Sequence, residues 1–352
     1  MSDNNDVIEP EDRDDVNDED IDNECDITDD INRLSISSER HDQQQQQQQL
    51  SIVERVQRGD FMKIAAPMVR FSRLPFRLLC KRWGCDITYS PMILADAFNR
   101  SQYARDSDFT TNAYDDALIV QFAANTAEEL TAAAEKVANH CQGIDINCGC
   151  PQKWVMKEGY GANLLLHPQK ITDMVKQTRN RVPIPLSIKI RIQPDLNKTV
   201  ELARQAEAAG VSWLAVHGRT SQQRSSHPVD YDAIKLVKES VSIPVFANGD
   251  IFTLRQAEEI RDRTGVNGVM SARGILCNPA LFKGYDVTPP ECVKDFMDIY
   301  TEFGGLHPNI LHRHLMYMLF SVHNKHEKLE FNRLNTTSAI MDFLSEKYFD
   351  NL

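Results

Sequence analysis

The segment GIDINCGCPQ, residues 143–152, joins a short strand to a loop with unusual chemistry. Residues 143–146 have the length and the largely apolar character of a buried strand. The strand ends at Asn147, and the glycine-containing loop that follows presents the thiol of Cys150 ahead of the rigid Pro151. Loops held at strand ends by a rigid scaffold usually carry binding and catalytic groups. We therefore expect a functional site here, in which the Asn147 amide hydrogen-bonds a planar heterocycle.

The same alternation of a short apolar run with a longer amphipathic stretch continues along the chain from residue 61. The expected strands lie at residues 63–66, 86–89, 118–122, 144–147, 186–190, 213–217, 245–248 and 266–270. The expected helices include residues 126–140, 199–209, 230–239 and 254–263. Thr126 is suited to cap a helix, and Gly210 and Gly265 stand where two helices should end. Eight strands in this order predict a TIM-type (β/α)8 barrel over residues 56–285 rather than an open sheet.

The chain changes character on both sides of this barrel. Beyond Pro289 and Pro290 the periodicity is helical throughout, so residues 291–352 are expected to form a small C-terminal helical domain. Residues 1–50 carry 17 acidic residues and 3 arginines, a net charge of −14, and include an unbroken glutamine run. Too little apolar surface and too much like charge predict disorder, so residues 1–55 are left out of the expected fold.

The acidic charge of the whole chain belongs to this N-terminal tail. Of the 39 basic and 51 acidic residues in the chain, 36 and 34 remain in the other 302 residues, which gives them a net charge of +2. The expected barrel and helical domain are therefore compatible with a polyanionic partner.

No apolar stretch approaches the roughly 20 residues that a membrane helix needs. The first residues also lack the basic and apolar regions of a secretory signal. The eight cysteines are therefore expected to be reduced thiols. We expect a cytoplasmic or nuclear protein without a membrane anchor.

The C-terminal ends of the strands are where functional residues gather in this type of barrel. Seven of the eight expected strands end there in polar or otherwise special residues: Pro67-Met68, Gln121, Asn147 with Cys150, Lys189, His217 to Thr220, Asn248 to Asp250, and Ala272 to Gly274. Because a purely structural barrel has no need of such an alignment, it predicts an active site at this face.

Three of these positions suggest particular chemistry. Lys189 closes an apolar strand, and it is either an exposed strand-end lysine, a Schiff-base lysine of the aldolase type, or a fixed cation beside a reduced flavin. His217 precedes a glycine, which allows a ligand to approach the backbone closely. Residues 248–250 and Arg273 follow the last two strands, where such barrels often bind phosphate. Ordinary turn chemistry is the alternative for the Asn-Gly pair.

The paired thiols Cys148 and Cys150 do not predict a metal site. No Cys or His pair with zinc-type spacing accompanies them. A free thiol has a pKa of about 8.5 and is mostly protonated at neutral pH. Cys150 therefore suits the role of a proton donor at least as well as that of a nucleophile.

Short motifs lie in one order along the expected barrel: Ala66-Pro67-Met68, Val120-Gln121-Phe122-Ala123, Asn147-Cys148-Gly149-Cys150-Pro151, Ser187-Ile188-Lys189-Ile190-Arg191, His217-Gly218-Arg219-Thr220, Asn248-Gly249-Asp250 and Ala272-Arg273-Gly274. Together they are highly specific, and residues 61–285 resemble the tRNA-dihydrouridine synthases. Residues 149–164 and 268–285, with the helical segment around His314, are most similar to the eukaryotic branch that acts at positions 20a and 20b of the tRNA D-loop.

This resemblance implies an FMN-containing barrel that uses NADPH or NADH, followed by a helical tRNA-binding domain, and we expect a monomer. It implies that FMN is held by Pro67, Met68, Gln121, Asn147, Lys189, His217, Asn248, Gly249, Asp250, Ala272, Arg273 and Gly274. The reduced flavin would deliver hydride to C6 of uracil, and Cys150 would protonate C5 from the opposite face. Many bacterial members have glycine where this chain has Ala272, which questions a backbone contact at that position and little else.

The uridine must leave its stack to reach a flavin, which requires phosphate contacts around the pocket. The candidates are Lys153, Lys157, Arg219, Arg224, His312, Arg313, Lys325 and Lys328, although each alone also fits a solvated surface charge. Three other functions are compatible with parts of the pattern. They are an FMN barrel oxidoreductase acting on a small molecule, a barrel lyase that uses Lys189, and a non-catalytic RNA-binding protein.

Overall fold

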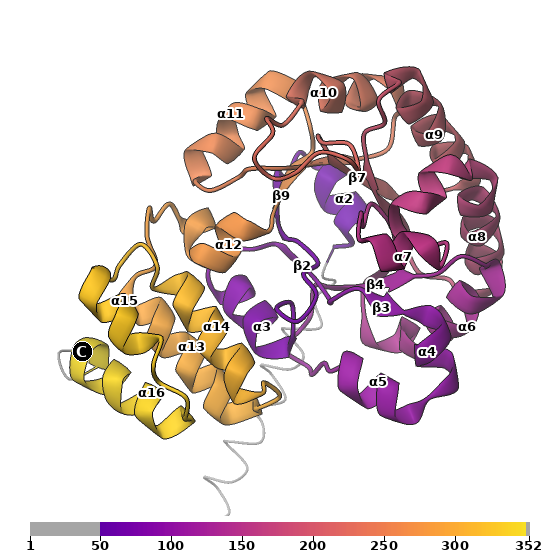
Figure 1. Ribbon diagram of the computed structural model, residues 1–352. Helices are drawn as coiled ribbons and strands as arrows, with labels where there is room; N and C mark the ends of the chain where they lie inside the picture. The colour runs from indigo at the N-terminus through magenta and orange to yellow at the C-terminus, as the bar shows by residue number, and fades with distance from the viewer. Residues whose placement is uncertain (1–49, 350–352) are drawn as a thin grey trace, which may run out of the picture. The chain divides into compact units, whose positions relative to one another are not determined.

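Eight parallel strands close into a barrel within residues 50–349, the part of the chain that the computed structural model describes (Figure 1). β1 pairs with β2, β2 pairs with β4, each strand from β4 to β8 pairs with the next, and β9 pairs with β1 to close the ring. A two-residue strand, β3, pairs with the end of β4. The expected TIM barrel is thus confirmed. The strands are β1 (Met62–Ala65), β2 (Ile87–Tyr89), β3 (Ile93–Leu94), β4 (Leu118–Ala123), β5 (Gly143–Cys148), β6 (Leu186–Arg191), β7 (Trp213–His217), β8 (Val245–Asn248) and β9 (Gly268–Ser271).

The strands of the ring lie within two residues of their predicted boundaries. The largest difference is at β9, which was expected from residue 266 and begins at Gly268. The Asn267 N–H donates to the carbonyl of Val245 at 2.9 Å, and the Asn267 side-chain oxygen accepts from the Val245 N–H at 3.1 Å. Asn267 therefore clamps the start of β8 before β9 begins.

The helices around the barrel also follow the sequence signals. Thr126 caps α6 by accepting a hydrogen bond from the Glu129 N–H at 3.2 Å. Gly210 and Gly265 end α9 and α11 in the left-handed conformation, with φ of +100° and +68°. Helix α9 begins three residues before its predicted start, because Asp195 provides the cap. The helices are α3 (Leu74–Arg82), α4 (Ala95–Arg100), α5 (Gln102–Asp108), α6 (Ala127–Val137), α7 (Lys153–Lys157), α8 (Pro168–Arg181), α9 (Leu196–Ala209), α10 (Tyr231–Ser240), α11 (Leu254–Thr264) and α12 (Arg273–Cys277).

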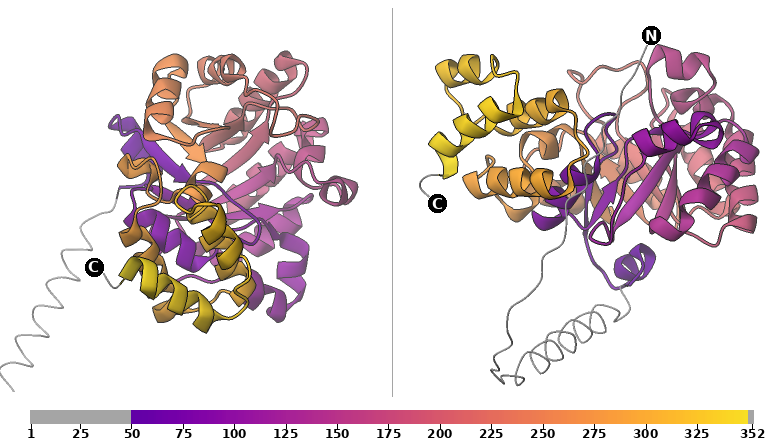
Figure 2. Two further views of the ribbon diagram at one scale, coloured as in Figure 1. Left: turned by 60° about the vertical axis from the view of Figure 1, so that its left-hand side comes forward. Right: turned by 90° about the horizontal axis from the view of Figure 1, so that it is seen from below.

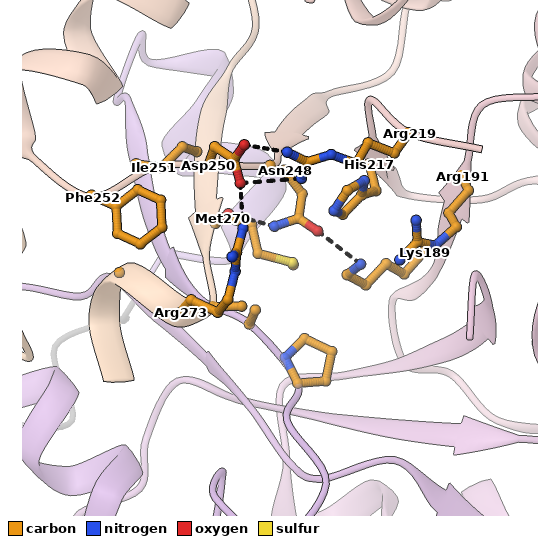
Figure 3. A pocket seen from close by; sticks show the side chains of 15 residues that line it. Lys189, Arg191, His217, Arg219, Asn248, Asp250, Ile251, Phe252, Met270 and Arg273 are labelled. Atoms are coloured by element: carbon orange, nitrogen blue, oxygen red, sulfur yellow. Dashed lines mark hydrogen bonds and ion pairs between the residues drawn. The ribbon is translucent and has the colours of Figure 1, made fainter. Parts of the chain in front are cut away.

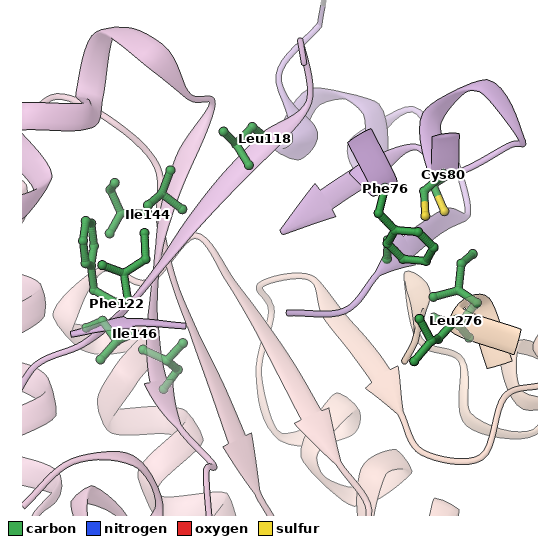
Figure 4. Packing of buried hydrophobic residues seen from close by; sticks show 14 of the residues in the cluster. Phe76, Cys80, Leu118, Phe122, Ile144, Ile146 and Leu276 are labelled. Atoms are coloured by element: carbon green, nitrogen blue, oxygen red, sulfur yellow. The ribbon is translucent and has the colours of Figure 1, made fainter. Parts of the chain in front are cut away.

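Side chains along each strand alternate between the helices and the barrel interior. Phe122, Ile144 and Ile146 face the helices and belong to the main apolar core (Figure 4). Trp213 and Phe246 belong to a second apolar cluster that fills the barrel interior. Toward the C-terminal strand ends, the interior positions are polar: Gln121, Asn147, Lys189, His217 and Asn248. Strand periodicity alone therefore directs these five side chains toward one another.

Helix α2 (Ile52–Gln57) precedes the barrel and belongs to its fold. Ser51 caps it with a capping box, and Ile52 and Val56 are buried in the interior cluster together with Met62 of β1. This helix begins inside the range 1–55 that the sequence analysis left out of the fold. The ordered chain therefore extends further toward the N-terminus than the composition indicated. The tail predicted to be disordered lies, up to residue 49, outside the described residues.

Four helices follow the barrel, as the periodicity after Pro289 predicted (Figure 2). The first of them packs on the end of α3, where Arg82 and the next residue, Trp83, both donate to Asp295 at 2.8 Å. None of the helices within residues 50–349 is long and apolar enough to cross a membrane. The four helices are α13 (Pro290–Phe303), α14 (Pro308–Met318), α15 (Lys325–Phe331) and α16 (Thr337–Leu344), and a short π-helical segment, Ser345–Phe349, comes after them.

An aromatic cluster joins these helices to the barrel. The ring of His314 in α14 lies 5.1 Å from that of Phe71, 4.7 Å from that of Phe76 and 5.2 Å from that of Phe296. His314 is fully buried, and burial lowers its pKa to about 3, so the imidazole is neutral. The uncharged ring therefore packs between α13, α14 and the segment after β1.

Candidate active site

A cavity opens at the C-terminal ends of β6 to β9 (Figure 3). Nine of the twelve predicted cofactor residues line it: Pro67, Lys189, His217, Asn248, Gly249, Asp250, Ala272, Arg273 and Gly274. The other three, Met68, Gln121 and Asn147, lie on neighbouring segments outside the lining. Asn147 is the direct neighbour of Lys189 across the β5–β6 pair. Residues from different strands thus meet at one end of the barrel, as the sequence predicted.

Lys189 is held in the cavity by an amide rather than by a carboxylate. Its Nζ donates to Asn248 Oδ1 at 3.0 Å, and Asn248 Nδ2 donates to the carbonyl of Met270 at 2.7 Å. Burial and the nearby Arg191 lower the pKa of Lys189 to about 8, while the charge of Asp145 opposes that shift. The ammonium is therefore fixed in place and largely charged at neutral pH. This geometry supports the fixed-cation interpretation over an exposed strand-end lysine.

His217 presents a neutral ring to the same cavity. Burial and then the charges of Lys189 and three arginines lower its pKa to about 2. Its buried Nδ1 has no hydrogen-bond partner among the described residues. Buried polar atoms without partners are rare in folded proteins. This orphaned nitrogen is therefore a ready contact for a bound polar group.

Positive charge dominates the cavity wall. Four of its lining residues are cations and only Asp250 is an anion; the cations are Lys189, Arg191, Arg219 and Arg273. Asp250 lies between Arg219 and Arg273 and forms ion pairs with both (Figure 3). Arg273 also lies over the ring of Phe252, 5.5 Å from its centre. Such a surplus of fixed cations in a partly enclosed site attracts phosphate.

The turn that carries Cys150 lies beside this cavity. Asn147 Oδ1 accepts hydrogen bonds from the N–H groups of Gly149 at 3.1 Å and Cys150 at 2.9 Å. Arg191, from the cavity wall, donates to the Gly149 carbonyl at 2.8 Å. Behind the turn, a Cβ at Gly161 would lie only 2.6 Å from the Cys150 carbonyl oxygen. The thiol therefore stands on a backbone that is fixed from three directions.

The two neighbouring thiols differ in their surroundings. Burial raises the pKa of Cys150, and the charges of Arg191 and Lys189 offset only part of this effect. The half-buried thiol is therefore protonated at neutral pH and remains partly accessible. Cys148 is completely buried in the apolar core between β5 and the helices. It serves packing.

Comparison with known proteins shows the family to which this chain belongs. Residues 64–342 match the dihydrouridine synthase (Dus) family. The chain belongs to the dihydrouridine synthase family. It is 53% identical over 302 residues to the mouse protein named tRNA-dihydrouridine(20a/20b) synthase [NAD(P)+]-like, with 85% of this chain and 92% of the mouse chain covered. The human protein of the same name is 52% identical, with 84% and 94% covered. The Saccharomyces cerevisiae tRNA-dihydrouridine(20a/20b) synthase [NAD(P)+] is 43% identical, with 82% and 81% covered.

The dihydrouridine synthase match confirms the family inferred from the sequence motifs, and it extends into α16. The positively charged residues predicted to contact RNA differ in their exposure to solvent. Lys153, Lys157, Arg224 and Arg313 are exposed. Arg219 is only 2% exposed and donates to Asp250 and to the carbonyls of residues 225 and 227. In this structure Arg219 is part of the cavity wall rather than of the surface.

Sequence reasoning missed several residues of this site. Arg191 lines the cavity and holds the Cys150 turn, and its position two residues after Lys189 on one strand face was the available signal. Met270 and Phe252 line the wall without any sequence feature that marks them. Asp145, completely buried two residues before Asn147, was counted within an apolar run.

Gly274 is required by packing at the start of α12. A Cβ at this position would lie 2.0 Å from the Ile251 carbonyl oxygen and 2.7 Å from Ser271 Oγ. We expect Gly274→Ala to lower the free energy of unfolding by about 2 kcal/mol, because backbone must move to admit the methyl group. Urea unfolding measures this. Gly265→Asn is the matched control, since that left-handed glycine has open space around it and asparagine tolerates the conformation.

Proposed function

We propose that the protein is a flavin-dependent tRNA-dihydrouridine synthase, which reduces the C5–C6 double bond of D-loop uridines with NADPH or NADH. The observation that carries the proposal is the cationic cavity beside the protonated Cys150 thiol, in a chain of the dihydrouridine synthase family. The names of the mouse, human and yeast relatives support tRNA as substrate, positions 20a and 20b, and NAD(P)H as donor.

The residues of the cavity suit FMN, whose phosphate carries negative charge and whose ring carries polar edges. Four cations and one carboxylate line the cavity, which suits the phosphate, and His217 Nδ1 has no hydrogen-bond partner within residues 50–349. Arg273 and His217 would hold the phosphate end. Lys189 would hold a polar edge of the ring, with Pro67, Met68, Gln121 and Asn147 around it. A bound flavin supplies the hydride chemistry that side chains lack.

The protein itself supplies orientation and a proton. Cys150 would donate the proton to C5 of uracil, because its thiol is protonated and its turn is fixed by Asn147 and Arg191. Proton donation by a positioned group contributes typically 10²–10⁴-fold to a rate. The Asn147 amide would hydrogen-bond the pyrimidine. Lys189 stays charged beside the cavity, which favours negative charge at the place where it develops.

The tRNA would lie across the face that carries the strand ends and reach the C-terminal helices. Lys153 and Lys157 are exposed on α7 and flank Trp154, whose side chain is 51% exposed. An aromatic ring between two basic residues suits a phosphate backbone with an unstacked base. Arg224, on a loop, and Arg313, on α14, are also exposed and would contact further phosphates. We propose residues 291–352 as a tRNA-binding unit of a monomer that acts in the cytoplasm or the nucleus.

The decisive experiment is the absorbance spectrum of the purified protein before and after anaerobic NADPH. We expect a flavin spectrum that bleaches and returns when unmodified tRNA is added, since the substrate reoxidises the cofactor. Mature tRNA with dihydrouridine already in the D-loop is the matched control and should restore little colour.

Other results would contradict the proposal in different ways. Colour restored by free uridine as readily as by tRNA would favour an FMN barrel oxidoreductase that acts on a small molecule. A colourless protein that FMN cannot reconstitute would remove the redox chemistry altogether.

A further inference from the structure

A chain of buried polar side chains leads from Asp145 to the Cys150 turn. Gln121 Nε2 donates to Asp145 Oδ2 at 2.8 Å. Asn147 Nδ2 donates to Gln121 Oε1 at 2.8 Å, and Asn147 Oδ1 accepts from the Cys150 N–H at 2.9 Å. Asp145 and Gln121 are 0% and 1% exposed. Three side chains from β4 and β5 thus connect the barrel interior to the backbone of the reactive thiol.

The direction of this chain is determined at both ends. A backbone N–H can only donate, so the oxygen of Asn147 must face the Cys150 turn. An ionised carboxylate can only accept, so the nitrogen of Gln121 must face Asp145. Both requirements leave the nitrogen of Asn147 facing the oxygen of Gln121, which is the donor and acceptor pair that the structure shows. Neither carboxamide can therefore rotate by 180° without losing a hydrogen bond at each of its ends.

Asp145 is expected to lower the stability of the barrel, because its carboxylate is buried in the interior. Among the described residues it forms no ion pair, and Ser187 Oγ donates to its other oxygen at 2.6 Å. Burial raises its pKa to about 6, against the opposing effects of Ser187, Gln121 and Lys189. The carboxylate is therefore largely ionised at neutral pH. A buried charge held only by neutral donors costs stability that an apolar residue would not. Packing alone does not explain Asp145.

We propose that Asp145 is a positioning residue that sets the orientation of the Gln121 and Asn147 carboxamides and, through them, the turn that carries Cys150. The second N–H of Asn147 Nδ2 makes no hydrogen bond among the described residues, which leaves it for a pyrimidine carbonyl. Asp145 thereby determines that Asn147 offers a donor, and not an acceptor, to the substrate. In this form the inference rests on the proposed function.

Two substitutions at one position separate positioning from charge. Asp145→Leu removes both acceptors and keeps the branched shape of the side chain. Asp145→Asn can keep its oxygen toward Gln121 and turn its amide toward Ser187 Oγ, because a hydroxyl also accepts and can donate to the Ile144 carbonyl 3.5 Å away. We expect tRNA-dependent reoxidation per bound flavin to fall about 100-fold in Asp145→Leu, the size of a misplacement near 1 Å, and to change little in Asp145→Asn.

A double-mutant cycle tests whether Asp145 acts through Asn147. In an Asn147→Ala background, Asp145→Leu should cost nothing further, because the connection to Cys150 is already cut. Losses that multiply would overturn the inference. Equal losses in Asp145→Asn and Asp145→Leu would overturn it too, and would assign the effect to the charge of Asp145 on Lys189. Ser187→Ala is the matched control, since it removes the other contact of Asp145 and leaves Gln121 in place.

A second readout needs neither tRNA nor flavin. The rate at which iodoacetamide alkylates Cys150 should rise in Asp145→Leu and stay at the wild-type value in Asp145→Asn, because only the first loosens the turn. If Asp145→Leu does not fold, Gln121→Met breaks the same chain at the next side chain and should raise the rate equally. An unchanged rate in the folded variant overturns the inference. Wild-type protein whose flavin tRNA cannot reoxidise would instead refute the proposed function, and the alkylation rates would still decide the role of Asp145.

Discussion

Cys150→Ala should lose dihydrouridine formation by about 10²–10⁴-fold, the usual contribution of a positioned proton donor. The substitution removes the thiol but none of the hydrogen bonds that hold the turn, since Asn147 and Arg191 contact backbone atoms there. Flavin binding and its reduction by NADPH should therefore persist. Single-turnover reoxidation of the reduced protein by unmodified tRNA, with dihydrouridine quantified in the product, measures the loss directly.

The neighbouring thiol provides the control for this prediction. Cys148→Ala removes a completely buried sulfur from the apolar core and leaves the Cys150 turn intact. It should cost some stability through the small cavity it creates and leave the rate per folded molecule near that of the wild type. Equal product from Cys150→Ala and wild type would refute the assignment of Cys150 as the acid.

Asp115→Ala should lower the free energy of unfolding by about 3–5 kcal/mol, the largest effect on stability that we expect from any single substitution. Asp115 accepts from Arg77 at 2.6 Å and 3.1 Å, and both side chains are almost completely buried. The guanidinium also donates to the carbonyls of Ser72 and Thr110. Removal of the carboxylate leaves the buried charge of Arg77, a residue of α3, uncompensated. Urea unfolding monitored by circular dichroism gives the difference.

Two further variants show whether the buried charge is the cause. Asp232→Ala breaks the ion pair of Arg263 with Asp232, whose side chains are 53% and 75% exposed, and should change stability by less than about 1 kcal/mol. The double variant Arg77→Met with Asp115→Leu removes both charges and should be more stable than Asp115→Ala. A double variant as unstable as the single one would assign the loss to packing instead.

The barrel was predictable because its signals are local. Each strand is a short apolar run, and alternation along a strand fixes which residues face inward, so Lys189, His217 and Asn248 had to meet at the C-terminal ends. The glycines at 210 and 265 marked helix ends for an equally local reason, since they adopt the left-handed conformation. The family motifs lie on these same strand ends.

The parts of the site that escaped prediction depend on partners distant in sequence. The sequence suggested that Arg219 is a surface cation. In the structure its guanidinium is paired with Asp250, which lies 31 residues later in the chain. Asp145 joins Gln121 and Ser187, which are 24 and 42 residues away. A charged residue at an inward position of a buried strand, in step with Asn147, was the only signal in the sequence. It showed that a partner was required but did not identify the partner.

The ring cluster around His314 limits how this protein can be taken apart. Deletion of the last four helices would expose Phe71 and Phe76 on the barrel. The truncated chain would then have an exposed aromatic patch that favours aggregation. If such a fragment bound RNA weakly, its aggregation would explain the result as well as the loss of an RNA contact would. The four C-terminal helices therefore cannot be removed or exchanged independently of the barrel. Replacement of these helices by others would therefore require changes in the segment after β1, which begins with Pro67 at the wall of the active-site cavity.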